Sequence, residues 1–376
     1  MSSTGKLLEP LGDLSFEEAY EAYKEQATAG AKAGADLVII ETMTDTYEMK
    51  AAVLAVKENS DLPILASFSF DERGKLLTGG DIACAVSLLE GLGVDALGIN
   101  CGFGPDIMKG FVKDFLYLSS TPVYIMPNAG VPKIEAGVTV FSSSPEDFSS
   151  IMYEVAKMGA PILGGCCGTT PDHLRLTIEK CSEVPFNPVD EKNISIISSY
   201  SKSCIIGEKP LIVGERINPT GKKIFKQALV NKDYDYIVDQ GLLQQEQGAD
   251  ILDVNVGMPG IDEAEVLERA VKELQTSVSL PLQLDSANPS ALERAMRLYN
   301  GKALVNSVSG KEEDLNAILP LVKKYGGVVV GLTLDDNGIP ETAQGRLEVA
   351  RKIVDRAESY GIAKKNIIID TLTMTV

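Results

Sequence analysis

The chain has 376 residues, 44% hydrophobic and 23% charged, a composition typical of soluble globular proteins with about two or three domains. Its net charge of −18 argues against nucleic acid as a partner, since phosphate binding requires clustered lysine and arginine. The first residues lack the apolar core of a signal peptide and no apolar run reaches the ~18 residues of a membrane span, so we expect a cytoplasmic protein with no membrane partner.

The first half of the chain alternates amphipathic stretches with short apolar runs. Residues 15–34 predict a helix, in which Ser15 caps the start and Glu18, three residues later, completes a capping box. The apolar runs are nearly continuous, as in parallel strands covered on both faces, and one begins every 26 to 39 residues, the size of a β–α unit. They span residues 35–42, 63–70, 96–101, 122–128 and 161–167.

The alternation stops at residues 182–209, which contain Pro, Asn and Ser without a β–α pattern and predict an interdomain linker. It then restarts, with apolar runs at 211–218, 249–256, 281–286, 303–309, 328–334 and 367–373. Repeated β–α units favour an α/β fold of two consecutive (β/α)8 barrels. A doubly wound sheet is the rival, but the chain has no GxGxxG loop. The barrels would occupy residues 1–181 and 210–376, both incomplete, with five and six of these predicted strands.

Three of the six cysteines fall at the carboxyl ends of predicted strands, where barrel enzymes place their active sites. Cys101 ends one strand, and the adjacent Cys166 and Cys167 end another. A disulfide between neighbours is disfavoured, because their Cα atoms lie only about 3.8 Å apart. Three thiolates suit a zinc ion with one open position, and the flanking glycines would let the strand pleat break so that both neighbours face the metal. Two packed thiols beside a glycine-rich turn are the alternative.

The other cysteines and the single histidine do not extend this cluster. Cys84 lies in an apolar helical pattern and is expected in the core, and Cys181 and Cys204 follow no pattern. His173 is expected in the first turn of a helix, on the surface. A zinc ion held by three thiolates is better suited to binding another thiol as a thiolate than to activating water.

Polar side chains end the strands predicted in the second half. Carboxylates and amides on neighbouring strand ends can hydrogen-bond a flat heterocycle with several N–H groups and a carbonyl, such as a pterin. Each residue alone could instead be a cap or turn residue, and Mg²⁺ is a further alternative for the carboxylates. The strand-end residues are Glu215, Asn218, Asp253, Asn255, Asp285, Asn306 and Asp370.

These motifs together resemble the two substrate modules of cobalamin-dependent methionine synthases. The sequences GINC, PNAG and GGCCGT resemble the homocysteine-binding module, and GERINPTG, DVNVG, QLDS and VNSVSG resemble the methyltetrahydrofolate-binding module, which is related to dihydropteroate synthase. The resemblance implies that Cys101, Cys166 and Cys167 bind zinc and that the homocysteine sulfur takes the fourth position. It also implies that Glu41 lies near the amino group of homocysteine and Asn128 near the metal.

In the second module, the resemblance implies that the seven strand-end residues surround the pterin ring. The implied reaction moves a methyl group from 5-methyltetrahydrofolate through cobalamin to homocysteine and gives methionine and tetrahydrofolate. The cobalamin would be bound by a module in cis or in trans. A zinc-dependent thiol methyltransferase with another methyl donor is the alternative.

Compared with that family, strands are missing at both ends of the chain. The family's first barrel has three strands before the segment that matches residues 2–12, SSTGKLLEPLG, and its second barrel has two more after the last strand predicted here. No cobalamin-binding module follows. We therefore expect a fragment of a longer gene product that is poorly soluble or inactive on its own.

Overall fold

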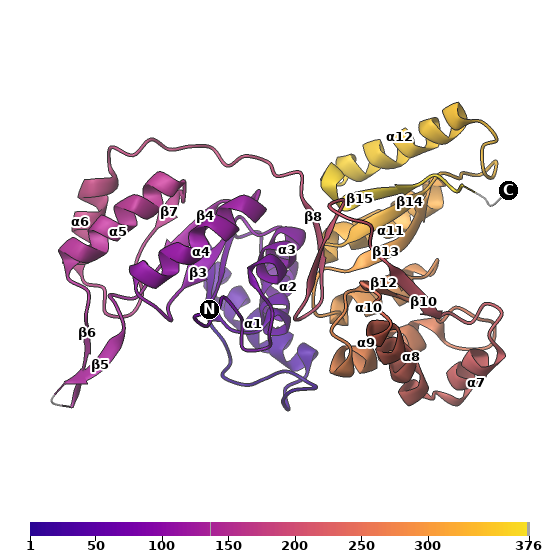
Figure 1. Cartoon of the computed structure of the whole chain (residues 1–376), viewed down its shortest axis with the longest axis horizontal. Coiled ribbons are helices and arrows are strands. Elements are labelled where there is room, and N and C mark those ends of the chain that lie inside the picture. The colour runs from indigo at the N-terminus through magenta and orange to yellow at the C-terminus, as the bar shows by residue number, and fades with distance from the viewer. Residues whose placement is uncertain (136, 374–376) are drawn as a thin grey trace. The chain divides into compact units, whose positions relative to one another are not determined.

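The protein consists of two α/β units, each built on a parallel sheet (Figure 1). The computed structural model describes residues 1–135 and 137–373. The units are Met1–Lys192 and Asn193–Val376, so the division falls inside the segment predicted as a linker. None of the helices in the described parts of the chain combines the length and the apolar character needed to cross a membrane.

The sheet of the first unit has five parallel strands in the order β1-β2-β3-β4-β7. Apart from an inserted hairpin, formed by β5 and β6, each strand lies beside the next one in the chain. This is the order of a barrel wall, whereas a doubly wound sheet reverses its strand order. The elements are α1 (Phe16–Lys32), β1 (Val38–Met43), α2 (Thr46–Asn59), β2 (Ile64–Phe68), α3 (Ile82–Leu92), β3 (Ala96–Asn100), α4 (Pro105–Leu118), β4 (Val123–Met126), β5 (Pro132–Glu135), β6 (Val138–Phe141), α5 (Pro145–Met158), β7 (Ile162–Leu163) and α6 (Pro171–Cys181).

The second unit repeats this arrangement with six parallel strands in the order β10-β11-β12-β13-β14-β15. The α/β fold and the eleven strands expected from the apolar runs are therefore confirmed. Its elements are β8 (Ser195–Ser198), β9 (Ser203–Ile206), β10 (Val213–Ile217), α7 (Lys223–Asn231), α8 (Tyr234–Glu246), β11 (Ile251–Val254), α9 (Glu263–Ser277), β12 (Leu282–Asp285), α10 (Pro289–Leu298), β13 (Leu304–Ser309), α11 (Glu312–Tyr325), β14 (Val328–Leu332), α12 (Ala343–Ser359), the 3-10 turn η1 (Lys364–Asn366) and β15 (Ile367–Asp370).

The start of the first predicted helix is confirmed in detail. The Ser15 hydroxyl accepts a hydrogen bond from the Glu18 backbone N–H, and the Glu18 carboxylate accepts one from the Ser15 backbone N–H, which is a complete capping box. Cys84 lies in α3 and is fully buried, as expected. The apolar faces of the helices cover the sheets, and successive helices of the first unit pack against one another.

Part of the predicted linker is ordered as a closing hairpin of strands β8 and β9. Ile197 of β8 is buried in a cluster with Ile251, Leu304 and Val328, the first residues of β11, β13 and β14. The Tyr299 hydroxyl also donates a hydrogen bond to the backbone carbonyl of Ser198, at 2.8 Å. The hairpin therefore covers the amino-terminal end of the second sheet, because its apolar side chains are needed there to exclude water.

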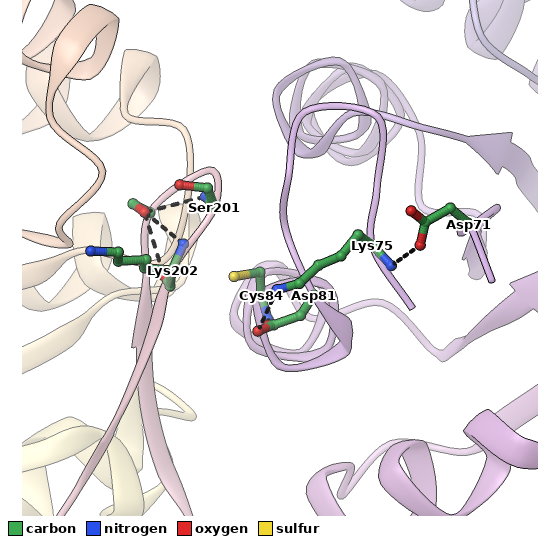
Figure 2. Close-up of polar contacts among 7 residues, drawn as sticks. Asp71, Lys75, Asp81, Cys84, Ser201 and Lys202 are labelled. Carbon is green, nitrogen blue, oxygen red and sulfur yellow. Dashed lines mark hydrogen bonds and ion pairs between the residues drawn. The ribbon is translucent and has the colours of Figure 1, made fainter. Parts of the chain in front are cut away.

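Two loops are held by side chains that cap backbone N–H groups (Figure 2). In the loop between β2 and α3, Asp71 accepts a hydrogen bond from the Lys75 backbone N–H, and Asp81 caps α3 by accepting from the Cys84 N–H. At the turn of the closing hairpin, the backbone N–H groups of Ser201 and Lys202 donate to the Ser199 hydroxyl. Local hydrogen bonds therefore help to fix the backbone of each loop.

Candidate functional site

Three cysteine side chains meet at the carboxyl end of the first sheet. Cys101 directly follows β3, and Cys166 and Cys167 lie in the loop between β7 and α6. The three sulfur atoms lie within 4.8 Å of one another, and the Sγ atoms of Cys101 and Cys167 are 3.9 Å apart. The described residues contain no other group of three Cys, His, Asp or Glu side chains that could hold a metal ion.

The backbone reaches this arrangement by leaving the regular strand conformation. Cys101 has a φ of +60°, in the left-handed region that non-glycine residues rarely adopt. Gly168 has a φ of +80°, and an added Cβ there would lie 2.2 Å from the Phe141 ring. Among the glycines expected to break the pleat, it is therefore Gly168 that requires its special backbone, whereas Gly164 and Gly165 do not have positive φ angles.

The geometry and chemistry of the cluster fit a zinc ion. In tetrahedral coordination, Zn–S bonds of about 2.3 Å separate neighbouring sulfurs by about 3.8 Å. The observed sulfur separations require little rearrangement to reach that value. Cys101, Cys166 and Cys167 would supply three ligands and leave one position for a fourth.

The Cys166 and Cys167 thiols of the metal-free protein are protonated at neutral pH. Burial, together with the nearby Cys101 sulfur, raises the pKa of the Cys166 thiol to about 12. Partial burial and Cys101 also raise the pKa of Cys167. Because a metal binds the thiolate form, metal binding must release protons and weaken at low pH.

Asn100, which the GINC motif places directly before Cys101 and to which the sequence assigned no role, is buried and hydrogen-bonds to Cys166 of the sulfur cluster. Its Oδ1 atom accepts hydrogen bonds from the Thr42 backbone N–H and the Ser67 hydroxyl, both at 2.7 Å. Its Nδ2 atom donates to Thr42 Oγ1 at 2.7 Å and to Cys166 Sγ at 3.7 Å. One amide therefore connects β1, β2, β3 and the cysteine loop, and it stabilises Thr42 at a φ of +60°.

We expect Asn100→Asp to weaken metal binding by about 10- to 100-fold, the usual effect of losing a hydrogen bond to a metal ligand. The carboxylate can still accept from Thr42 and Ser67, but it places negative charge beside Cys166 where an N–H donor lay. Competition of Co²⁺ or Zn²⁺ with a chromophoric chelator measures the affinity. The control Ser67→Ala removes another bond to Asn100 and leaves the donor in place, so an equal loss in both variants would contradict this role.

The two residues expected near homocysteine lie at the same end of the sheet. Asn128 is buried after β4, and its Oδ1 atom accepts a hydrogen bond from the Cys167 backbone N–H at 3.1 Å. Glu41 is half-buried in β1, immediately before Thr42, and its charge helps to raise the pKa of the buried Tyr124, for which burial is the main cause. The structure thus ties Asn128 directly to the cysteine loop, and it places Glu41 near Tyr124.

The second sheet has a polar cluster at its carboxyl end. Asn255 Nδ2 donates to Asp285 Oδ2 at 3.0 Å, and Asn218 Nδ2 donates to Glu215 Oε1 at 3.0 Å. Burial raises the pKa of Asp285, and the charges of Glu215 and Glu263 add to this shift. These contacts bring four of the seven predicted residues into two bonded pairs, one around the half-buried Asp285 and one around the exposed Glu215.

Asp253 is the most deeply buried carboxyl group of this cluster, with 2% of its surface exposed. Burial raises its pKa to about 7, and the Asp285 carboxylate adds to the shift. The Gln283 amide donates to Oδ1, whereas Oδ2 is buried without a hydrogen-bond partner among the described residues. Asp253 is therefore largely protonated below neutral pH.

The remaining predicted residues are Asn306 and Asp370. Asn306 is half-buried in β13, and its side chain interacts with Asp253. Asp370 is exposed at the end of β15 and accepts a hydrogen bond from the Leu372 backbone N–H at 2.7 Å. The sequence did not identify Gln283 or Glu263, since a glutamine inside a strand and an acidic residue in the first turn of a helix both have ordinary structural roles.

The comparisons with known proteins agree with this division into two units. Residues 1–181 match the family described as Homocysteine S-methyltransferase, and residues 214–375 match the family described as Pterin binding enzyme. The methionine synthase of Mycobacterium leprae is 31% identical over 392 residues, and that of Mycobacterium tuberculosis is 32% identical over 389 residues. Each alignment covers 99% of this chain but 32% of the relative, so the chain spans about a third of the length of these proteins.

The fold also resembles solved structures over part of its length. The homocysteine methyltransferase MmuM from Escherichia coli, in its apo form, is 24% identical, with a TM-score of 0.38 over 45% of this chain and 58% of that chain. The 7,8-dihydropteroate synthase from Vibrio fischeri is 16% identical, with a TM-score of 0.36 over 48% of this chain and 68% of that chain.

Proposed function

Because the chain carries a homocysteine S-methyltransferase domain followed by a pterin-binding domain, we propose that it takes part in methyl transfer from 5-methyltetrahydrofolate to homocysteine. The observation that carries this proposal is the cluster of sulfur atoms from Cys101, Cys166 and Cys167 at one end of a parallel sheet. The polar cluster around Asp253 and Asp285, at the corresponding end of the other sheet, supports a separate folate site.

The overall reaction balances without an additional reactant. The bond between N5 of 5-methyltetrahydrofolate and its methyl carbon breaks, and a bond between that carbon and the homocysteine sulfur forms. The thiol proton of homocysteine leaves and N5 gains a proton, so the products are methionine and tetrahydrofolate. A cobalamin bound by a module in cis or in trans would supply the nucleophile and carrier for the methyl group.

In the first unit, the protein holds and orients the thiol acceptor. Cys101, Cys166 and Cys167 would bind a zinc ion, whose chemistry is to keep a thiol as a thiolate at neutral pH. Asn100 donates an N–H to Cys166, and Asn128 orients the Cys167 backbone, so the ligand sulfurs are fixed before substrate arrives. We propose that Glu41 binds the amino group of homocysteine.

In the second unit, the polar cluster binds and orients the folate. The acceptor oxygens of Asp285, Asp370 and Glu215 suit the N–H groups of a pterin, and the amides of Asn218, Asn255 and Asn306 can pair with its carbonyl and ring nitrogens. Asp253 in its protonated form would add an O–H donor. Hydrogen bonds that favour protonated N5 assist the departure of the methyl group, because the neutral amine is the better leaving group.

The first test of the proposal is proton release when homocysteine is added to the zinc-loaded protein, a readout of thiol binding that does not require turnover by the fragment. We expect proton release in the parent and in Cys181→Ser, whose side chain lies at the end of α6 outside the cluster. We expect Cys101→Ser to abolish it. Folate binding is tested separately by calorimetry with 5-methyltetrahydrofolate, which Asp285→Ala should weaken.

Two outcomes would contradict the proposal. If Cys101→Ser retained the parent's zinc content and its proton release with homocysteine, the sulfur cluster would not be the site. If the parent bound 5-methyltetrahydrofolate no better than Asp285→Ala, the polar cluster would not bind folate.

All six cysteines are free in the structure, as in proteins of a reducing compartment, and we propose a cytoplasmic location.

A further inference from the structure

His173 is buried, contrary to the surface position expected from the sequence. It occupies the third position of α6, where a long polar side chain commonly reaches solvent, yet only 5% of its surface is exposed. Its ring packs edge-on against Phe148 of α5, with ring centroids 5.4 Å apart and an interplanar angle of 90°. The side chain is therefore held between two helices rather than displayed on one.

The neighbours of the imidazole determine which nitrogen carries the proton. Nε2 lies 3.1 Å from the backbone carbonyl oxygen of Ser143, which can only accept a hydrogen bond. Nδ1 lies 3.2 Å from the backbone N–H of Thr170, which can only donate. Both contacts are satisfied together only when the ring is neutral, with the hydrogen on Nε2.

These two contacts complete a ring of hydrogen bonds around the cysteine loop. The Ala129 N–H donates to the Cys167 carbonyl at 2.9 Å, and the Ser143 N–H donates to the Ala129 carbonyl at 2.9 Å. His173 then connects Ser143 to Thr170, which is three residues after Cys167 and caps α6. The ring joins the segment that carries Asn128 to the segment that carries Cys166 and Cys167.

The cysteine loop has other supports near its start. The Cys166 N–H donates to the Pro127 carbonyl at 2.7 Å, and the Cys167 N–H donates to Asn128 Oδ1 at 3.1 Å. After Cys167, the Thr169 hydroxyl donates to the Cys166 carbonyl at 2.7 Å within the same loop. The bond from His173 to Ser143 differs from this one, because it connects the Thr170 end of the loop to a residue 30 positions from His173.

We propose that His173 is a positioning residue that locks the cysteine loop through its Nε2–H bond to Ser143. This inference rests on the proposed metal site, but it concerns how the chain holds two of the ligands in place. His173 does not touch the sulfurs, and both of its ring nitrogens are engaged, so it is neither a ligand nor a base in this role. The competing interpretation is that His173 acts only as the local capping residue of α6.

A matched pair of variants separates the two interpretations. Glutamine and glutamate both suit the third helical position of a capping box, so both preserve the local cap on Thr170. Only glutamine has an N–H that can replace the bond to the Ser143 carbonyl. We expect His173→Gln to bind Zn²⁺ or Co²⁺ within about 3-fold of the parent and His173→Glu to bind it about 10- to 100-fold more weakly, as for other residues that orient metal ligands.

A second measurement works without metal. Hydrogen exchange of the metal-free protein should be faster in His173→Glu than in the parent and in His173→Gln, in peptides covering residues 127–145 and 162–172. If the Glu variant does not fold, His173→Met, which lacks both the donor and the cap acceptor, is compared with Thr170→Ala, which removes the N-cap side chain and leaves the bond from His173 to Ser143, so that only the former should exchange faster in residues 127–145. Equal exchange and equal metal affinity in the Gln variant and in the variant without a donor would overturn the inference. If the parent binds no zinc, the proposed function fails instead, and the exchange data still decide the role of His173.

Discussion

Replacing Cys166 by serine should remove tight metal binding from the protein. A serine hydroxyl is a poor zinc ligand, and the two remaining thiols, Cys101 and Cys167, cannot complete the site. We expect zinc affinity to fall by more than about 100-fold, since losing even an outer hydrogen bond to a ligand costs about 10- to 100-fold. The measurement is zinc per chain after dialysis, followed by chelator competition.

The same experiment distinguishes a metal site from a pair of packed thiols. Addition of zinc to the parent should release protons, because the Cys166 and Cys167 thiols are protonated in the metal-free protein. The control Cys181→Ser removes a half-buried thiol outside the cluster and should bind zinc as the parent does. If the parent binds no zinc and releases no protons, Cys166 and Cys167 are packed thiols.

Replacing Asp253 by asparagine should change the free energy of unfolding more favourably at alkaline pH than at acid pH. The carboxyl has a pKa near 4 in an unfolded chain and about 7 in the folded protein. Between these values the folded state binds more protons, so the free energy of unfolding falls as the pH rises from about 4 to about 7. The loss of unfolding free energy caused by ionising Asp253, roughly 4 kcal/mol at most, is complete above pH 7. Asparagine does not ionise, so the variant does not undergo this loss.

Unfolding of both proteins, followed by circular dichroism at pH 4.5 and pH 8, measures this difference. The effect of Asp253→Asn on unfolding free energy should be more favourable at pH 8 than at pH 4.5 by a few kcal/mol. Asp336→Asn, at an exposed position in the loop after β14, controls for the loss of one charge. If the effect of Asp253→Asn were the same at both pH values, Asp253 would not carry the proton that its burial implies.

The sheets could be predicted from the sequence because their inner strands, such as β3 and β11, are buried on both faces. Runs such as residues 35–42 and 96–101 are almost continuously apolar, and the strands β1 and β3 lie within or next to them. The two hairpins could not be predicted in this way. The strands of the inserted hairpin are largely exposed, and those of the closing hairpin are four residues each, too short for a clear periodicity.

The candidate site was predictable only where chemistry coincided with strand ends. The sequence placed Cys101 and Cys166–Cys167 at the carboxyl ends of two different strands, and the structure brings their sulfurs together, although their role as ligands stays a prediction. Asn100 was not identified, because its importance lies in contacts with Thr42, Ser67 and Cys166, which are far apart in the sequence. His173 was predicted on the surface for the same reason, since Phe148 and Ser143 bury it from another element.

The closing hairpin covers the amino-terminal end of the second sheet and leaves the polar side chains at its carboxyl end. Its apolar side chains, with Ile197 at their centre, fill the amino-terminal end, whereas the carboxyl end carries Asp253, Asp285 and their polar neighbours. A polar ligand of this unit is therefore expected to approach and leave at the carboxyl end of the sheet, away from the apolar cluster around Ile197.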